Sequence, residues 1–91
     1  MVIDKNIIIK KYKAVIDGTL SYADADRWSW EMMQKCDERH LQFTPPEEEQ
    51  MLWELIQYLY GIDTPSMEDR TKTARNNLDI RKFLSEKGIE I

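Results

Sequence analysis

Apolar residues in this chain recur every three or four positions, which is the spacing of one face of an α-helix. The clearest stretch is a heavy apolar stripe formed by Leu52, Leu55, Ile56 and Leu59. The preceding run Thr44-Pro45-Pro46-Glu47 predicts a helix start, with threonine as cap, proline at the first helical position and glutamate completing a capping box. Gly61 predicts the helix end. We expect this third helix to be the central element of the fold.

Three further helices are predicted by similar patterns. The first covers about residues 5–17, with Asp4 as its cap and Gly18 at its end. The second covers about residues 22–40, opens at Ser21, and has an apolar stripe of Ala25, Trp28, Met32 and Cys36. The last begins after Asn76 or Asn77, ends before Gly88, and carries Leu78, Ile80, Phe83 and Leu84.

The stretch between the third and last helices has few apolar residues, so we expect residues 67–77 to be exposed and mobile. A short helical turn is predicted near its start, at Thr64-Pro65 or Ser66 followed by Glu68 and Asp69. The tail 89–91 alternates but is too short to establish a strand. The whole pattern predicts an all-α fold, a compact bundle of four to five short helices forming a single domain over residues 1–91.

Composition agrees with a folded domain. The chain has 91 residues, of which 42% are hydrophobic and three are tryptophan, unlike a disordered sequence. A single cysteine excludes an internal disulfide framework. No apolar run approaches the roughly 20 residues that span a bilayer, and the first residues lack the apolar core of a signal peptide. We therefore expect a soluble cytoplasmic protein without a membrane partner, monomeric when free.

The net charge of −4 conceals an uneven distribution. Residues 1–20 carry a net charge of +2, residues 21–69 carry −9 from twelve acids and three bases, and residues 70–91 carry +3. An acidic centre repels phosphate, so nucleic acid is not an expected partner. Two interpretations remain open. The basic ends fold back and neutralise the centre, or the acidic block is an interaction surface for a basic protein.

No residue set predicts catalysis or a cofactor. Cys36 and His40 lie four residues apart on the predicted second helix, but the chain has no other cysteine or histidine to complete a zinc site. Cys36 lies on the predicted core face, where a reactive thiolate would be poorly solvated. We therefore expect no metal, no cofactor and no enzymatic activity.

Several spaced turn and apolar residues resemble those of a widespread set of small bacterial proteins. They are Gly18-Thr19-Leu20-Ser21, Trp28, Trp53-Glu54-Leu55, Leu59, Gly61, Asp63, Leu78-Asp79-Ile80 and Phe83-Leu84. Members of that set are of similar length, read as all-helical and are largely uncharacterised, and some resemble immunity proteins that neutralise toxins delivered between competing bacteria. The resemblance implies a bacterial, non-enzymatic, protein-binding role.

These observations together predict a small acidic protein-binding module, an immunity-type inhibitor of a basic toxin. Aromatic side chains ringed by acids suit such recognition. The predicted contact residues are Glu47, Glu48, Glu49, Glu54, Asp63, Glu68 and Asp69, with Trp30 or Tyr58 as an anchor. The alternatives are a helix-turn-helix-like regulatory or nucleic-acid-binding module, built from the first two helices, and a structural adaptor.

Overall fold

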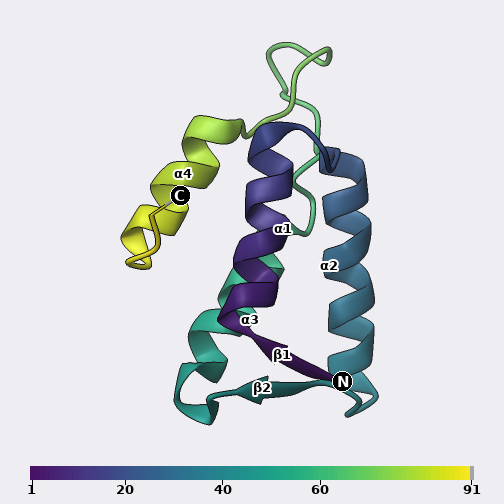
Figure 1. The fold of residues 1–91 in the computed structure, drawn as a ribbon. Coiled ribbons are helices and arrows are strands. Elements are labelled where there is room, and N and C mark those ends of the chain that lie inside the picture. Colours follow the sequence, from purple (N-terminus) through teal and green to yellow (C-terminus); the bar gives the residue numbers. More distant parts are fainter. Residues whose placement is uncertain (91) are drawn as a thin grey trace.

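The computed structural model describes residues 1–90 and contains four α-helices and one small parallel sheet (Figure 1). The elements in chain order are β1 (Val2–Asp4), α1 (Lys5–Asp17), α2 (Tyr22–Asp37), β2 (Gln42–Thr44), a 3-10 turn η1 (Pro46–Glu48), α3 (Glu49–Leu59) and α4 (Asn77–Glu86). The predicted mostly helical domain is confirmed. The stricter prediction of an all-α fold is wrong, because the sheet is an integral part of the structure.

The sheet joins the N-terminus to the middle of the chain. β1 and β2 pair in parallel, with Ile3 opposite Phe43 and Asp4 opposite Thr44. The side chains of Ile3 and Phe43 are both buried. α1 and α2 form the crossover between the two strands (Figure 1). Each strand has three residues, which is too few for an alternating pattern to be recognised in the sequence.

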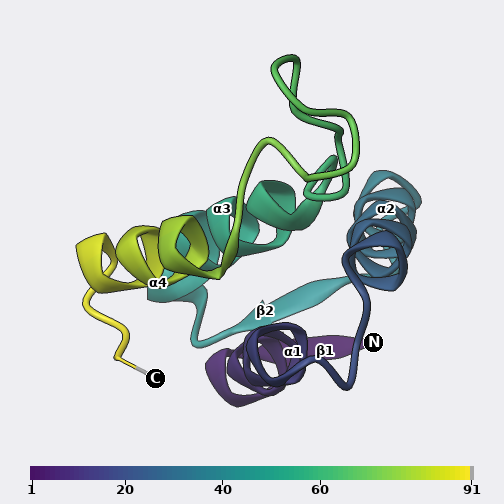
Figure 2. The same ribbon diagram turned by 90° about the horizontal axis from the view of Figure 1, so that it is seen from above.

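Local signals set the boundaries of α1 and the start of α2 as predicted. The carboxylate of Asp4 accepts a hydrogen bond from the backbone N–H of Ile7, and Gly18 ends α1 with φ of 86°. The hydroxyl of Ser21 accepts from the N–H of Asp24. The two helices run antiparallel on either side of this turn (Figures 1 and 2).

The end of α2 comes earlier than predicted. The helix stops at Asp37 rather than near residue 40, and Arg39 adopts a left-handed φ of 61°. The N–H of His40 donates to the carbonyl of Lys35, a bond that closes the helix end. Because a non-glycine residue takes the left-handed position, no glycine marks this end in the sequence.

The start of α3 also differs from the prediction. Thr44 is not a helix cap, because it pairs with Asp4 in the sheet, and the Thr44–Pro45 peptide bond is cis. Pro45 is extended, with ψ of 154°, since a residue followed by proline avoids the helical region. The turn η1 therefore begins at Pro46, and α3 begins at Glu49 without a side-chain cap.

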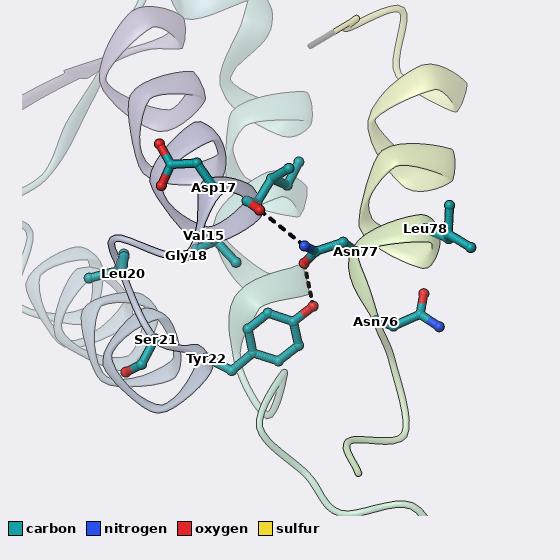
Figure 3. A pocket seen from close by; sticks show the side chains of 10 residues that line it. Val15, Asp17, Gly18, Leu20, Ser21, Tyr22, Asn76, Asn77 and Leu78 are labelled. Carbon is teal, nitrogen blue, oxygen red and sulfur yellow. Dashed lines mark hydrogen bonds between the residues drawn. The ribbon is translucent and has the colours of Figure 1, made fainter.

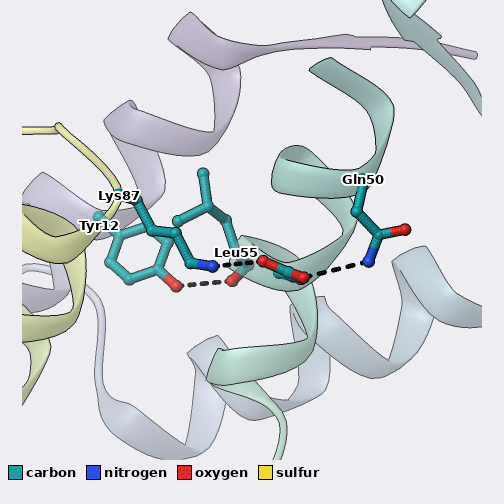
Figure 4. Close-up of polar contacts among 5 residues, drawn as sticks. Tyr12, Gln50, Leu55 and Lys87 are labelled. Atoms are coloured by element: carbon teal, nitrogen blue, oxygen red, sulfur yellow. Dashed lines mark hydrogen bonds and ion pairs between the residues drawn. The ribbon is translucent and has the colours of Figure 1, made fainter. Parts of the chain in front are cut away.

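The predicted central role of α3 is confirmed. Its stripe of Leu52, Leu55, Ile56 and Leu59 is fully buried. Two buried hydroxyl groups hold the helix against its neighbours. Tyr12 of α1 donates to the carbonyl oxygen of Leu55 at 2.6 Å, and Ser29 of α2 donates to that of Ile56 at 2.5 Å. Figure 4 shows the first of these contacts.

Exposure was predicted for residues 67–77, and residues 67–76 do form a mostly exposed part of the loop between α3 and α4. Ile62, at the start of this loop, is buried, and the predicted helical turn does not form. Pro65 and Thr73 form an antiparallel bridge instead. α4 then begins with a complete capping box between Asn76 and Asp79. Its Leu78 is 75% exposed, so only part of the predicted apolar set on this helix is buried. The last residue of the predicted alternating tail, Ile91, lies outside the described residues.

Candidate functional site

Three consecutive acids stand at the N-terminal end of α3. Glu47 and Glu48 belong to η1, and Glu49 is the first residue of α3. Within residues 1–90 none of their carboxylates has a hydrogen-bond or ion-pair partner. Negative charge is favourable at a helix N-terminus, so the fold tolerates this uncompensated cluster.

A pocket of about 350 Å³ lies between these acids and the C-terminal end of α2. It is lined by Cys36, Phe43, Pro46, Glu47, Glu49, Gln50 and Trp53. The rings of Phe43 and Trp53 meet edge to face, with centroids 6.3 Å apart and planes at 75°. The pocket therefore combines an aromatic pair with two unpaired carboxylates. Phe43 lies on β2. Because this strand was not predicted, the sequence did not indicate that Phe43 lines the pocket.

Glu54 differs from the three acids at the start of α3, because its carboxylate has partners within the chain. Its carboxylate forms an ion pair with Lys87 and also accepts from the side chain of Gln50 (Figure 4). The hydrogen bond from Lys87, and to a smaller extent that from Gln50, lowers the pKa of Glu54 below its ordinary value. Glu54 therefore ties α3 to the segment after α4 and is not a free charge for a partner.

The remaining predicted acids lie beyond the opposite end of α3. Asp63 follows the helix, and Glu68 and Asp69 lie in the exposed loop. α3 spans 11 residues, about 16 Å, so the predicted acids form two groups rather than one cluster. The Asp69 carboxylate accepts from the hydroxyl and N–H of Thr71, which lowers its pKa.

The two predicted anchors have different surroundings. The side chain of Trp30 on α2 is 50% exposed. Tyr58 is stacked on Phe83 with ring centroids 3.9 Å apart, and the guanidinium of Arg75 lies 4.7 Å from its ring centre. Tyr58 is thus partly covered by residues of this chain, and Trp30 is the more accessible of the two predicted anchors.

A second exposed aromatic residue, which the predicted site omitted, is Tyr60, directly after the C-terminal end of α3. Tyr60 is 55% exposed and precedes Gly61, whose N–H donates to the carboxylate of Asp26 at 2.6 Å. Trp30 lies one helical turn after Asp26 on α2. The hydrogen bond to Asp26 thus ties the segment after α3 to the N-terminal half of α2, whereas Trp30 lies near the middle of that helix.

Three of the ten bases in the two terminal segments, residues 1–20 and 70–91, lie over aromatic rings. Lys11 lies over Trp28 at 5.6 Å, Arg75 over Tyr58, and Lys87 over Phe83. Among residues 1–90, no such cation covers Trp53. Apart from the ion pair of Lys87 with Glu54, the ends leave the predicted contact acids without an ion-pair partner in the described part of the chain.

A groove of about 540 Å³ lies between the α1–α2 turn and the start of α4 (Figure 3). Asn77 crosses it by donating to the carbonyl of Ile16 at 3.0 Å and accepting from the hydroxyl of Tyr22 at 2.6 Å. Its central polar groups are already bonded to one another. The hydrogen bonds of Asn77 across this groove thus attach α4 to the first two helices.

The predicted placement of Cys36 and His40 on one helix is wrong. α2 ends before His40, so Cys36 and His40 do not share a helix as predicted, and His40 lies 3.4 Å from the carboxylate of Glu38. Within residues 1–90, no group of three potential ligand side chains could hold a metal ion. None of the helices described in this structure is long and apolar enough to cross a membrane.

The first two helices do not have the layout of a helix-turn-helix module. α1 and α2 form an antiparallel hairpin, whereas that motif crosses its helices at about 90–120° (Figures 1 and 2). In addition, α2 begins with Asp24 and Asp26 where phosphate contacts would be needed.

Comparison with known proteins adds no family: no family model, no curated protein and no solved structure matches this chain.

Proposed function

We propose that this chain is a protein-binding module that recognises a basic protein through its acidic central segment. The resemblance noted in the sequence favours one form of this function, an immunity-type inhibitor of a basic bacterial toxin. The proposed surface includes Glu47, Glu48 and Glu49 at the N-terminal end of α3, Asp63 beyond its other end, and the exposed Trp30 on α2.

One observation carries this proposal: the acids at the start of α3 stay unpaired. The alternative interpretation, in which the basic ends neutralise the centre, requires ion pairs to these acids. The structure offers Glu54–Lys87 alone among the predicted contact acids, and within residues 1–90 Glu47, Glu48 and Glu49 have no such partner. Unpaired acids beside the half-buried ring of Trp53 suit a basic partner.

The mechanism is steering followed by occlusion. Exposed carboxylates raise the rate at which a basic partner is encountered, and this effect weakens as salt screens the charges. Trp30 is then buried on contact and slows dissociation, because burial of a large aromatic side chain dominates many interface energies. The bound module would cover the basic, functional surface of the toxin.

The test requires the partner to be identified first, by affinity capture from the native host and mass spectrometry. Association of the purified proteins is then measured at low and high salt. Glu48→Lys combined with Glu49→Lys should lower the association rate several-fold at low salt and flatten its salt dependence. Glu86→Lys with Glu90→Lys is the matched control, because it changes the net charge equally at exposed positions elsewhere.

The control variant should retain most of the salt dependence. The proposal is abandoned if neither the double variant Glu48→Lys with Glu49→Lys nor Asp69→Lys changes the association rate. The acidic segment would then not face the partner.

A further inference from the structure

We propose that the pocket at the start of α3 binds the guanidinium group of a single arginine side chain presented by the partner. This inference rests on the proposed function and names the anchor point within it. The feature that carries it is the pocket formed by Phe43, Trp53, Glu47 and Glu49, rather than the acids alone.

The size of the pocket suits a single side chain. Its volume of about 350 Å³ is near the lower end of ligand pockets, which run from roughly 300 to 1,000 Å³. Its lining comes from three segments: the end of α2, β2, and the run from Pro46 to Trp53. Residues on α2 and α3 are held together by the buried hydrogen bond from Ser29 to Ile56, so the pocket is built on packed elements.

The aromatic pair provides the surface on which a guanidinium can stack. In this same protein three aromatic rings are each covered by a base, at distances of 4.7 to 5.6 Å. Trp53 is half-buried and, among the described residues, has no cation over it. Tryptophan is the strongest of the aromatic partners for a cation. An external cation can therefore occupy a position that the chain leaves open.

The carboxylates complete the recognition. Glu47 and Glu49 both line the pocket, are unpaired within residues 1–90, and have no base among the lining residues. A guanidinium is planar, so it can stack on an indole while its edge donates to carboxylate oxygens. The ammonium group of lysine is not planar, so it cannot stack on the indole in the same way. We therefore expect arginine to bind more tightly than lysine.

Glu48 separates this inference from general electrostatic attraction. It lies between the two lining glutamates but does not line the pocket itself. Neutralising Glu48 changes the local charge without removing a pocket ligand. Glu48→Gln, which removes one neighbouring charge, is therefore the local control for Glu47→Gln and Glu49→Gln.

The experiment titrates N-acetyl-arginine amide into the full chain and follows the indole N–H signals of the tryptophans by NMR. The signal of Trp53 is assigned with Trp53→Phe. We expect a saturable shift of the Trp53 signal with arginine amide and no saturable shift with the citrulline amide, which has the same shape without the charge. Glu47→Gln with Glu49→Gln should weaken the arginine affinity about tenfold, equivalent to 1.4 kcal/mol, whereas Glu48→Gln should change it less than about twofold.

Cys36 supplies a second readout, because it lines the pocket and is the single cysteine of the chain. Its modification by a cationic methanethiosulfonate should be faster, relative to an anionic one, than that of a free thiol in solution. Arginine amide should slow the modification. The double Gln variant should bring the rate ratio toward that of the free thiol, and circular dichroism would verify that the variants stay helical.

The inference is overturned if citrulline amide binds as well as arginine amide, or if lysine amide binds as well as arginine amide. It is also overturned if Glu48→Gln weakens binding about threefold, which is the share of the tenfold loss expected for one charge if local charge alone mattered. These outcomes are distinct from failure of the proposed function. Should arginine amide fail to bind while charge reversal still slows partner association, the pocket assignment alone is wrong. Should it bind while charge reversal has no effect, the pocket binds arginine but the partner does not use it, and the proposed acidic docking surface is wrong.

Discussion

At the scale of single residues, the hydroxyl groups of Tyr12 and Ser29 position α3. Each donates to a carbonyl oxygen of that helix from a buried site. Burial also raises the pKa of the Tyr12 phenol, so this group stays protonated and remains a donor. Polar groups at these two points specify how α3 lies against α1 and α2, in addition to the apolar contacts of the core.

Removing one hydroxyl tests this role. Tyr12→Phe should lower the free energy of unfolding by about 0.5–1.5 kcal/mol, the usual net value of one hydrogen bond, as measured by urea denaturation. Tyr60→Phe is the control, because Tyr60 is exposed, and it should shift stability by less than about 0.5 kcal/mol. Equal effects of the two variants would contradict a structural role for the Tyr12 hydroxyl.

The ion pair of Glu54 with Lys87 predicts a pH dependence. The pKa of Glu54 is lowered in the folded state, so its contribution to stability is complete above its ordinary pKa of 4.5 and is lost as the pH falls through the lower, folded value. Glu54→Gln should therefore lower the free energy of unfolding near neutral pH, and its difference from the unmodified protein should shrink in acid.

Denaturation at a series of pH values measures that difference. Lys87→Gln should reproduce the pH trend, because it removes the partner that lowers the pKa. Glu90→Gln, at an exposed position, should leave the pH trend of the unmodified protein unchanged. A Glu54→Gln difference that is constant from neutral to acid pH would show that the ion pair adds no stability.

At the scale of elements, α4 is attached to the remainder of the fold at few points. Asn77 bonds to both Ile16 and Tyr22 at its start, and Lys87 bonds to Glu54 after its end (Figures 3 and 4). Ile80 and Leu84 supply its buried contacts. An element fixed in this way should open more easily than the α1–α2–α3 core.

Amide hydrogen exchange tests this attachment. Asn77→Ala removes both hydrogen bonds at the first joint, so amides of α4 should exchange faster while those of α3 change little. Arg81 has contacts of its own, so the control is Lys82→Ala, at an exposed position on the same helix. Uniform acceleration across α3 and α4 would instead mean that the two helices open as one unit.

At the scale of the whole molecule, the parallel sheet closes the fold across some forty residues of chain. Ile3 is fully buried, whereas its neighbour Val2 is 52% exposed. Ile3→Ala should therefore lower the free energy of unfolding by about 2–5 kcal/mol, as large-to-small core changes do, in denaturant unfolding. Val2→Ala should cost less than about 1 kcal/mol. Similar losses for the two variants would mean that β1 does not contribute to the core as described.

The sequence by itself determined the features that depend on neighbours within a few positions. Asp4, Ser21 and Asn76 act as caps because a side chain reaches amides two or three residues onward, and the stripe on α3 follows from helix period alone. The identity of the acids and their concentration in residues 21–69 are likewise readable without a structure.

The tertiary structure alone decided the features that depend on distant residues. β1 and β2 pair across forty positions, so neither three-residue strand is evident locally, and this pairing converts Thr44 from a predicted cap into a strand residue. The same folding covers Tyr58 with Arg75 and Phe83, pairs Glu54 with Lys87, and gathers Cys36, Phe43 and Trp53 around one pocket. Local propensity carries no information about such contacts, because they form only when separate elements pack together.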